Sequence, residues 1–325
     1  MRAMTETTSP EGVSEPGVPV IDIADLAARR TRAAIDAACR DWGIFQVINH
    51  GVAQDTLLAL LEEQRRFFAL PQGDKLRIER TADNPWGFYN RELTKNTPDW
   101  KEIFDVGQAT GTEQPQWPAH RAEFRRCVGA ADAAMQALAR RLLAVLAENL
   151  GEPAAALHDS FTAHTSFLRL NFYPTCATPA RADSPTVPDA GRLGIGHHTD
   201  AGALTVLVQD DQPGLQVLHN ERWHTVEARA DALVINLGDI AQVWSNDAYQ
   251  APLHRVLANA THTRCSTAFF FNPSYDATYA PLPSQCINQK PRYQRISWRD
   301  FRAQRSAGDY ADHGAEVQIS DYRTG

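Results

Sequence analysis

The sequence lacks a hydrophobic run long enough to cross a membrane. A membrane-spanning helix needs about 20 consecutive apolar residues, and none of the 325 residues lies in such a run. The polar start, residues 1–16, also lacks the hydrophobic segment and cleavage site of a secretion signal. We therefore expect a protein that does not enter a membrane and is not exported.

Cysteine is scarce, and its spacing predicts neither a disulfide framework nor a zinc site. Five cysteines are scattered along the chain, and no Cys-x-x-Cys pair is among them. An odd number of separated cysteines does not indicate disulfide bonding, and the missing pairs exclude the usual zinc motifs. Reduced thiols are typical of the cytoplasm, which is the location that we expect.

Positive charge is not in excess either. The formal net charge is -7 at pH 7, and no run of Lys and Arg alternates with aromatic residues, so the composition disfavours a nucleic-acid partner. No segment indicates an obligatory protein partner. Hydrophobic residues, by contrast, make up 43% of the chain, which is enough for the core of one large globular unit.

The first motif with metal-ligating residue types is His198-Thr199-Asp200. On an extended backbone, residues two apart point to the same face, so His198 and Asp200 can bind one ion while His197 points to the opposite face. His254, far along the chain, is a candidate third ligand. Two histidines and one carboxylate leave open metal positions, as in non-haem Fe(II) oxygenases. Because a His-x-Asp pair alone is more often a surface turn, this interpretation needs a second motif.

That second motif is Arg264-Cys265-Ser266, which begins ten residues after His254. Arg264 and Ser266 share one face of an otherwise apolar strand, and an inward guanidinium needs an anion. Its planar fork suits a carboxylate, to which the hydroxyl can add a hydrogen bond. The alternative is a salt bridge to one of the protein's own acids. The two motifs in this order are far more specific than either one alone.

With these motifs in this order, the sequence resembles the 2-oxoglutarate- and iron-dependent dioxygenases of the isopenicillin N synthase-like type. The resemblance covers roughly residues 18–320. It implies a mainly β fold with flanking helices around a double-stranded β-helix, or jelly-roll, core. Besides the two motifs, it rests on the segments Val18-Pro19-Val20-Ile21-Asp22, Trp42-Gly43-Ile44-Phe45-Gln46-Val47-Ile48-Asn49-His50-Gly51, Leu170-Asn171-Phe172-Tyr173-Pro174, Gly214-Leu215-Gln216-Val217, Asn236-Leu237-Gly238-Asp239, His254-Arg255-Val256 and Phe271-Asn272-Pro273.

The chain is expected to form one compact structural unit with three parts. Residues 1–17 are expected to be a disordered tail because they are rich in polar residues, Gly and Pro. Residues 18–160 are expected to form the N-terminal helical and strand region, and residues 161–325 the jelly-roll core with a C-terminal cover. Within the core, the Pro- and Ala-rich residues 175–189 are expected to be a loop that can close over the site.

Hydrophobic periodicity predicts helices over residues 26–41, 54–70 and 121–150. Short strands separated by Gly, Asp and Pro turns are predicted in the second half of the chain, and Gln242-Val243-Trp244 is counted among them. One further helix, around residues 298–304, is expected to cover the mouth of the barrel.

The resemblance implies that Fe(II) is held by His198, Asp200 and His254. It also implies that 2-oxoglutarate binds this metal and that Arg264 and Ser266 pair its distal carboxylate. O2 is then the second cosubstrate, 2-oxoglutarate is decarboxylated to succinate and CO2, and a small organic metabolite is oxidised. Hydroxylation is the expected outcome, and desaturation, ring closure and epoxidation are the alternatives.

Three further site residues are expected on one strand. Arg169, Asn171 and Tyr173 alternate with apolar residues and therefore share one face. In the family the matching Asn and Tyr lie beside the oxoacid, so Asn171 and Tyr173 are expected there, and Arg169 is expected to contact the substrate. The alternative is a solvated face at the edge of a sheet.

Four aromatic or polar residues are expected to contact the substrate. Phe270 and Asn272 lie an even number of residues after the arginine of the second motif, so they face the cavity if the strand has no bulge. Phe88 and Phe104 belong to an aromatic segment that lines the pocket in family members, and ordinary packing is the alternative for both. Together with Arg169, this set suits a small or medium substrate with an apolar body and a carboxylate.

Two other functions are weighed against this one. Some relatives keep the fold and the metal ligands but do not consume 2-oxoglutarate, and they too have Arg-x-Ser. A non-catalytic module that binds a metabolite is a different class of protein, which the intact metal triad disfavours. A succinate assay tests the first alternative, and a metal titration tests the second.

Overall fold

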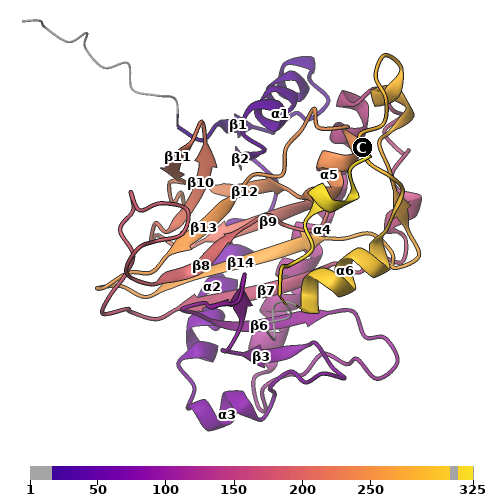
Figure 1. Cartoon of the computed structure of the whole chain (residues 1–325). Helices are drawn as coiled ribbons and strands as arrows, with labels where there is room; N and C mark the ends of the chain where they lie inside the picture. Colours follow the sequence, from indigo (N-terminus) through magenta and orange to yellow (C-terminus); the bar gives the residue numbers. More distant parts are fainter. Residues whose placement is uncertain (1–16, 308–313, 325) are drawn as a thin grey trace, which may run out of the picture.

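The computed structural model describes residues 17–307 and 314–324, so the expected tail lies, apart from Gly17, outside the described residues. Two sheets form the jelly roll. The larger has eight strands in the order β1-β2-β12-β9-β14-β7-β6-β3, which follow one another from top to bottom in Figure 1. The smaller has four strands in the order β11-β10-β13-β8. The expected mainly β, jelly-roll fold is confirmed.

The larger sheet combines strands from both halves of the chain. It contains β1 (Val20–Asp22), β2 (Ile44–Ile48), β3 (Gly87–Tyr89), β6 (Glu102–Gly107), β7 (Phe167–Tyr173), β9 (Leu204–Gln209), β12 (Ala232–Leu237) and β14 (Arg264–Phe271). The smaller sheet contains β8 (Leu193–His198), β10 (Leu215–His219), β11 (Arg222–Thr225) and β13 (His254–Leu257). Two further pairs are β4 (Leu93–Thr94) with β5 (Thr97–Pro98) and β15 (Thr278–Tyr279) with β16 (Ile296–Ser297). The N-terminal strands thus extend the larger sheet at both of its edges.

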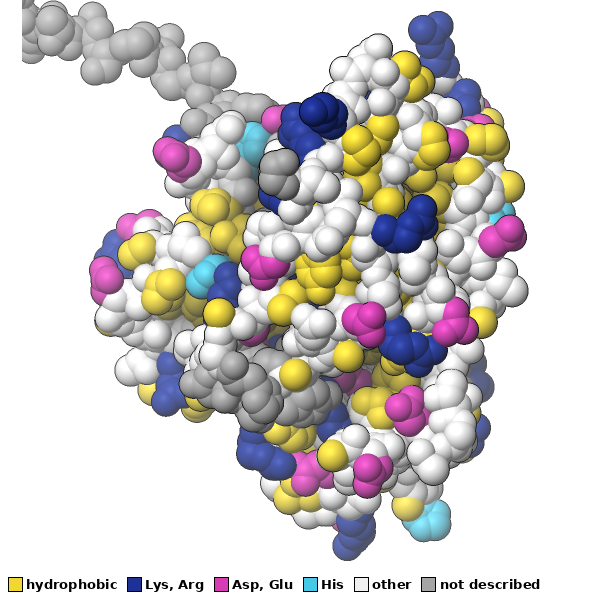
Figure 2. Space-filling view, turned by 45° about the vertical axis from the view of Figure 1, so that its right-hand side comes forward, with side chains coloured by type: hydrophobic (Ala, Val, Ile, Leu, Met, Phe, Trp, Pro, Cys, Tyr) yellow, Lys and Arg dark blue, Asp and Glu magenta, His cyan; other side chains and the backbone are white. Residues whose placement is uncertain are grey.

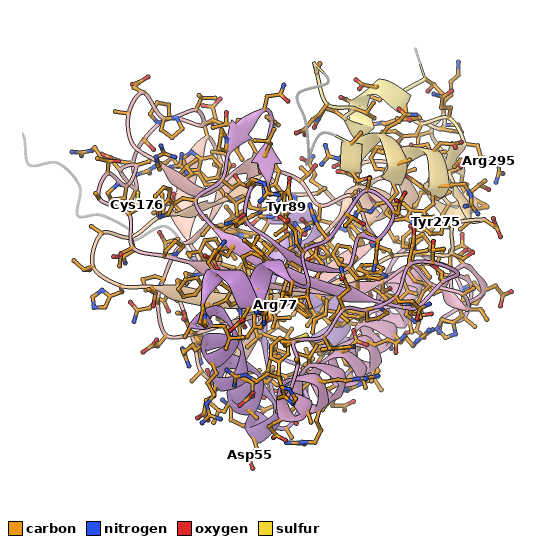
Figure 3. The ribbon with its side chains drawn as sticks, turned by 90° about the horizontal axis from the view of Figure 1, so that it is seen from below. Asp55, Arg77, Tyr89, Cys176, Tyr275 and Arg295 are labelled. Carbon is orange, nitrogen blue, oxygen red and sulfur yellow. The ribbon has the colours of Figure 1, made fainter. Side chains whose placement is uncertain are left out.

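Helices cover one face of the larger sheet. These are α1 (Arg29–Asp41), α2 (Gln54–Phe68) and α4 (Ala122–Asn149), close to the predicted ranges, and a short α3 (Gln72–Leu76) follows α2. The C-terminal helix α6 (Trp298–Ala307) lies on the opposite side of that sheet (Figures 1 and 3). In Figure 3, Asp55 marks the side of α2 and Arg295 marks the side of α6. One face of the sheet is therefore left for a cavity beneath α6.

Strand β14 shows how the sequence separates the apolar core from that cavity. Its residues alternate, so Phe269 and Phe271 are buried among the helices, in the cluster that also holds residues of α2 and α4. Arg264, Ser266 and Phe270, at the other parity, line the cavity. The pairing of β14 with β7 and β9 has no register shift, so the condition for the expected orientation of Phe270 is met.

The same alternation corrects the expectation that Phe88 and Phe104 contact the substrate. The two residues are paired across β3 and β6, and both side chains are fully buried in the hydrophobic core. The ring of Phe104 lies 5.0 Å from that of Phe67 on α2. Neither residue lines the cavity. They have the parity of the helix-covered face, whereas Asp105, one position on, points to the cavity side and bonds Arg169.

Residues 242–244 form part of a helix and not the predicted strand. Helix α5 spans Asp239–Trp244 and begins directly after Gly238. The amides of Asp239 and Ile240 donate to the carbonyls of Asp200 and Gly202, so the start of the helix is tied to the segment that carries Asp200. A three-residue apolar run has no periodicity that distinguishes strand from helix, which explains the error.

The loop over residues 175–189 does not close over the cavity. Arg255 points away from the cavity, is fully buried, and donates to the carbonyls of Ala182, Ser184 and Pro185. None of the loop residues lines the cavity. Because Arg255 and His254 are neighbours on β13 with opposite orientations, the arginine anchors the loop to the outer face of the smaller sheet.

No helix within the described ranges is long and apolar enough to span a bilayer. All five cysteines are free, and four of them are buried. On the face drawn in Figure 2, acidic and basic side chains are interspersed. That face therefore presents no extended field of a single charge sign.

Candidate metal centre

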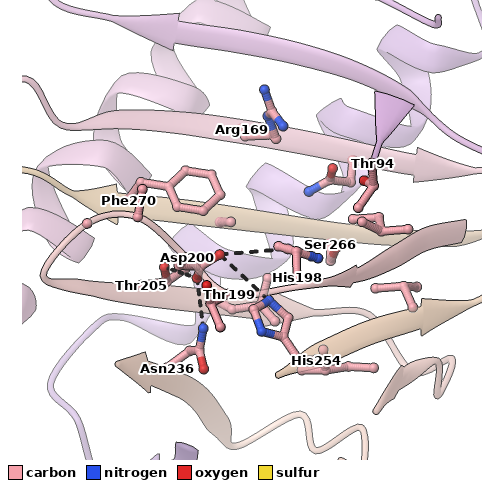
Figure 4. Close-up of a pocket in the computed structure, with 18 of the residues that line it drawn as sticks. Thr94, Arg169, His198, Thr199, Asp200, Thr205, Asn236, His254, Ser266 and Phe270 are labelled. Carbon is pink, nitrogen blue, oxygen red and sulfur yellow. Dashed lines mark hydrogen bonds and ion pairs between the residues drawn. The ribbon is translucent and has the colours of Figure 1, made fainter. Parts of the chain in front are cut away.

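A cavity of about 170 Å³ opens on the face of the larger sheet opposite the helices. A single water molecule needs only about 10–15 Å³, so this space holds a ligand of many atoms. All the expected site residues except Phe88 and Phe104 line it: Arg169, Asn171, Tyr173, His198, Asp200, His254, Arg264, Ser266, Phe270 and Asn272. In Figure 4, where ten of the lining residues are labelled, His198 and His254 are turned toward Asp200.

The structure brings His198, Asp200 and His254 together although His254 is distant in sequence. Strand β8 ends at His198, and β13 pairs beside it with His254 directly opposite His198. One ligand atom from each residue lies within 4.8 Å of the others. Oδ1 of Asp200 is 3.8 Å from Nε2 of His198 and 3.6 Å from Nε2 of His254. This set of two imidazole nitrogens and one carboxylate oxygen fits Fe(II).

Backbone carbonyls orient both imidazoles toward the centre of this triad. Nδ1 of His198 lies 2.8 Å from the carbonyl of Gly196, and Nδ1 of His254 lies 3.0 Å from that of Pro252. A carbonyl can only accept, so each Nδ1 carries the proton and donates it. The lone pair is therefore on Nε2, the atom that faces Asp200, as in metal-binding histidines generally.

The two carboxylate oxygens of Asp200 have different neighbours. Oδ2 accepts hydrogen bonds from Oγ1 of Thr205 at 2.5 Å and from Nδ2 of Asn236 at 2.8 Å. Oδ1 faces the two histidines. Dashed lines in Figure 4 trace these contacts. The carboxylate is thereby fixed in a position from which one oxygen can ligate a metal.

The protonation states of His198 and Asp200 also suit metal binding. Burial and the neighbouring His254 lower the pKa of His198 to about 3, so the ring is neutral near pH 7 and its lone pair is free. Burial alone would raise the pKa of Asp200, but the two histidines and its hydrogen bonds hold that pKa below its ordinary value. His198 and Asp200 can therefore bind a cation without first releasing protons.

Arg264, the first residue of β14, is buried, and all its hydrogen-bond partners are neutral. It donates from Nη2 to Oε1 of Gln209 at 2.8 Å, from Nη1 to Oγ of Ser266 at 3.3 Å, and from Nε to the carbonyl of Gln212. Its guanidinium lies 5.0 Å from the centre of the Tyr173 ring. No carboxylate of the described residues lies within ion-pair distance of it. The alternative of a salt bridge to one of the protein's own acids is thus not realised there.

Asn171 and Tyr173 face the same end of the cavity. They pair with Ser266 and Arg264, respectively, across β7 and β14. Oδ1 of Asn171 is buried and has no hydrogen-bond partner among the described residues. A buried carbonyl oxygen without a partner is costly, so a ligand or a water that donates to it would stabilise this end of the cavity.

Arg169 lies in the cavity wall, but its charge is used internally. Its guanidinium forms two hydrogen bonds to Asp105 and one to Glu92. Lys101 binds Glu92 at 2.6 Å and Asp99 at 3.0 Å. Since Glu92, Asp99 and Asp105 are all nearly inaccessible to solvent, they neutralise these cations. The charge of Arg169 is therefore already compensated by the protein's own carboxylates and is not available to pair with a substrate.

Several cavity residues were not identified from the sequence. Thr205 and Asn236 hold Asp200, and their only sequence signal is a polar residue inside or at the end of an apolar strand. Arg302 and Arg305 of α6 also line the cavity. The predicted C-terminal cover is thus present, but no sequence pattern assigned the charges of that helix to the site.

Comparisons with known proteins agree with this geometry. The family model of the 2OG-Fe(II) oxygenase superfamily matches residues 164–273, and that of the non-haem dioxygenase in morphine synthesis N-terminal region matches residues 18–124. Gibberellin 2-beta-dioxygenase 8 of Arabidopsis thaliana is 33% identical over 300 residues, which cover 90% of this chain and 83% of the relative. Jasmonate-induced oxygenase 2 of the same organism is 30% identical over 92% of this chain and 82% of its own length.

Solved structures are similar over nearly the whole chain. A crystal structure of JOX2 in complex with 2OG, Fe and JA has a TM-score of 0.81 and 28% identity, and covers 95% of this chain and 90% of that one. T7H of Neurospora crassa has a TM-score of 0.78 and 24% identity over 91% of this chain and 98% of its own; at that identity the likeness concerns the fold. The chain therefore belongs to the 2OG-Fe(II) oxygenase superfamily and is a dioxygenase that uses Fe(II) and 2-oxoglutarate.

Proposed function

We propose that His198, Asp200 and His254 hold the Fe(II) of this dioxygenase. The observation that supports this assignment most directly is the shared orientation of their free ligand atoms, Nε2, Oδ1 and Nε2, toward one point. Bound Fe(II) with 2-oxoglutarate and O2 supplies an oxidant for C–H bonds and yields succinate and CO2. The chain itself fixes the metal and excludes water from the cavity.

Arg264 and Ser266 bind the distal carboxylate of 2-oxoglutarate in this proposal. The guanidinium is buried with neutral partners only, and a carboxylate would give it a bidentate, charge-assisted pair. Asn171 and Tyr173, opposite these residues on β7, line the same subsite and position the cosubstrate.

The substrate occupies the other part of the cavity, beside Phe270 and Asn272. The ring of Phe270 stacks on Phe167 at 4.8 Å, which gives this part an apolar wall. We propose a small organic metabolite with an apolar body, in keeping with the JOX2 structure, which contains JA with 2OG and Fe. Hydroxylation is the proposed outcome. The free cysteines support a cytoplasmic location.

The first experiment measures 2-oxoglutarate affinity by calorimetry on the anaerobic manganese form of the whole protein. Arg264→Lys keeps the charge but loses the fork, so it should weaken binding about 10- to 100-fold, and Arg264→Ala should weaken it further. Ser266→Ala, which removes one neutral donor, should change the affinity less than about threefold. Unchanged affinity in Arg264→Ala would mean that 2-oxoglutarate binds elsewhere.

A second measurement addresses the metal and the two alternative functions. Asp200→Ala should lose metal binding and all release of succinate, because one of three ligands is removed. A wild-type protein that oxidises its substrate without stoichiometric succinate would instead be a metal oxidase of the same fold. A wild-type protein that binds no iron would be a metabolite-binding module.

A further inference from the structure

The positive charges around the cavity are almost all compensated by the protein itself. Arg169 is held by Asp105 and Glu92, and Lys101 by Glu92 and Asp99. These ion pairs are largely shielded from solvent. A substrate anion would have to displace a buried carboxylate to bind either cation, which is unfavourable because the displaced charge would remain unpaired in the protein.

Arg305, on the C-terminal helix α6, is compensated as well. It donates from Nη2 to the carbonyl of Thr199 at 2.8 Å and from Nη1 to that of Val317 at 3.1 Å. Oε2 of Glu316 lies 3.8 Å from Nη1. Arg305 therefore connects the cover to the segment that carries Asp200 and to the C-terminal residues, and it already has a carboxylate beside it.

Arg302, one turn earlier on α6, differs from these cations in its surroundings. It lines the cavity and is partly buried, and its guanidinium lies 5.5 Å from the centre of the Phe167 ring. Within residues 17–307 and 314–324, no carboxylate is within ion-pair distance of it and no hydrogen bond to it is formed. Arg264, the other cavity arginine without an acidic partner, is assigned above to 2-oxoglutarate. Arg302 is thus the cation left for a second anion.

The wall next to Arg302 is apolar. The ring of Phe167 is in cation–π contact with its guanidinium, and the Phe270 ring stacks on the Phe167 ring with 4.8 Å between the ring centres. Trp298, one turn before Arg302 on α6, is a fully buried lining residue. A ligand bound to Arg302 would therefore place an anionic head at the cover and an apolar body against these rings.

We propose that the substrate is a monocarboxylic acid with an apolar body and that Arg302, not Arg169, binds its carboxylate. This inference rests on the proposed function, because it places the substrate between Arg302 and the Fe(II) ligands. The planar guanidinium fork matches a carboxylate with two parallel hydrogen bonds. The ring of Phe167 supports the guanidinium by a cation–π contact, and Arg302 lines the cavity, where a ligand can reach it. Arg302 is thereby the residue that sets substrate class.

The test uses acids and their methyl esters as matched probes on the full chain. 3-Phenylpropanoate and octanoate, each beside its methyl ester, are titrated into the anaerobic manganese form saturated with 2-oxoglutarate, and affinity is measured by calorimetry. At least one acid should bind about tenfold or more tightly than its ester, because the ester lacks the charge. Arg302→Gln should weaken that acid about 10- to 30-fold and the ester less than about twofold.

Two further variants serve as controls. Arg299→Gln lies on the same helix, but its guanidinium is exposed and pairs with Asp276, so it should leave acid binding unchanged. Arg302→Lys should restore part of the acid affinity that Arg302→Gln loses. An equal melting temperature for all three variants would show that the effect is local and not a loss of the cover.

The outcomes separate this inference from the proposed function. The role of Arg302 is overturned if no acid binds more tightly than its ester, or if Arg302→Gln and Arg299→Gln bind the acid equally well. In either case, 2-oxoglutarate binding by the same samples leaves the proposed function intact. If Arg302→Gln lost affinity for 2-oxoglutarate and Arg264→Ala did not, Arg302 would be the residue that binds 2-oxoglutarate. That result would overturn both the proposed role of Arg264 and the proposed role of Arg302.

Discussion

Nδ2 of Asn236 donates a 2.8 Å hydrogen bond to Oδ2 of Asp200, and Thr205 donates to the same oxygen. Asn236 is on β12 and pairs directly with Thr205 on β9, so neighbouring strands of the larger sheet fix one carboxylate from the segment after β8. The other oxygen of Asp200 is left to face the two histidines. In the proposed metal site, the position of the metal is therefore defined by the sheet as well as by the three proposed ligands.

The first prediction follows from this contact. Asn236→Ala and Thr205→Val each remove one donor to Oδ2, so Asp200 should lose its fixed orientation while all three metal ligands remain. Loss of such a supporting hydrogen bond typically weakens metal binding about 10- to 100-fold. Anaerobic titration with Fe(II) or Mn(II) measures it. Wild-type affinity in both variants would show that the two hydrogen bonds do not position Asp200.

Side-chain alternation allowed much of the site to be predicted from the sequence. Arg264, Ser266 and Phe270 on β14, and Asn171 and Tyr173 on β7, all face the cavity as expected, because both strands pair without a bulge. Period-two alternation is a local property. It can be read from the sequence wherever the strand itself is recognised.

Contacts between distant segments could not be predicted in this way. Arg169 has the right parity, but its partner Asp105 lies on β6, and nothing in the sequence pairs those two positions. Phe104 was placed in the cavity from its aromatic neighbourhood, although its parity on β6 sends it into the core. The assignment of Asn236 to Asp200 likewise requires the order of the strands in the sheet, which periodicity does not contain.

The second prediction distinguishes the two adjacent histidines. His198 lines the cavity and His197 does not; the surroundings of His197 include Lys95 and Glu316. His197→Ala should therefore retain iron binding with at most a modest loss, whereas His198→Ala should lose it. Iron content after equilibrium dialysis measures both. The opposite pattern would mean that the register of β8 is shifted by one residue, because such a shift reverses every side chain of a strand.

The third prediction contrasts two phenylalanines on opposite faces of the larger sheet. Phe104 is fully buried under α2 and α4, so Phe104→Ala should lower the free energy of unfolding by about 3–5 kcal/mol through lost burial and a cavity. Phe270 is partly exposed in the substrate cavity, and Phe270→Ala should cost only about 1–2 kcal/mol. Urea unfolding of the metal-free protein measures both values.

The effects of the same two substitutions on KM should have the opposite order: Phe270→Ala should change KM more than Phe104→Ala. At a temperature where both variants are folded, Phe270→Ala should raise KM for the substrate, because the apolar wall is lost, while Phe104→Ala should leave KM near the wild-type value. If Phe104→Ala changed KM more than Phe270→Ala did, the assignment of the two faces of the sheet would be incorrect.

The fourth prediction concerns pH and Asp132 on α4. Burial raises the pKa of its carboxyl from 3.8 to about 6, so the folded protein binds this proton more tightly than the unfolded chain does. The contribution to stability is fully present below about pH 4 and is lost as the pH rises through about 6. Above that range the buried charge destabilises the fold. Asp132→Asn removes the charge and should make the protein relatively more stable as the pH rises.

The difference in unfolding free energy between Asp132→Asn and the wild type should grow between about pH 4 and pH 7 and then stay constant. A shift of about two pKa units corresponds to about 3 kcal/mol; because the side chain keeps some contact with solvent, we expect about 1–2 kcal/mol. Urea unfolding at a series of pH values measures this difference. Asp189→Asn, at an exposed loop position, is the control and should show no such slope. A difference that does not depend on pH would mean that Asp132 is ionised in the folded protein throughout this range and that its burial has no energetic consequence.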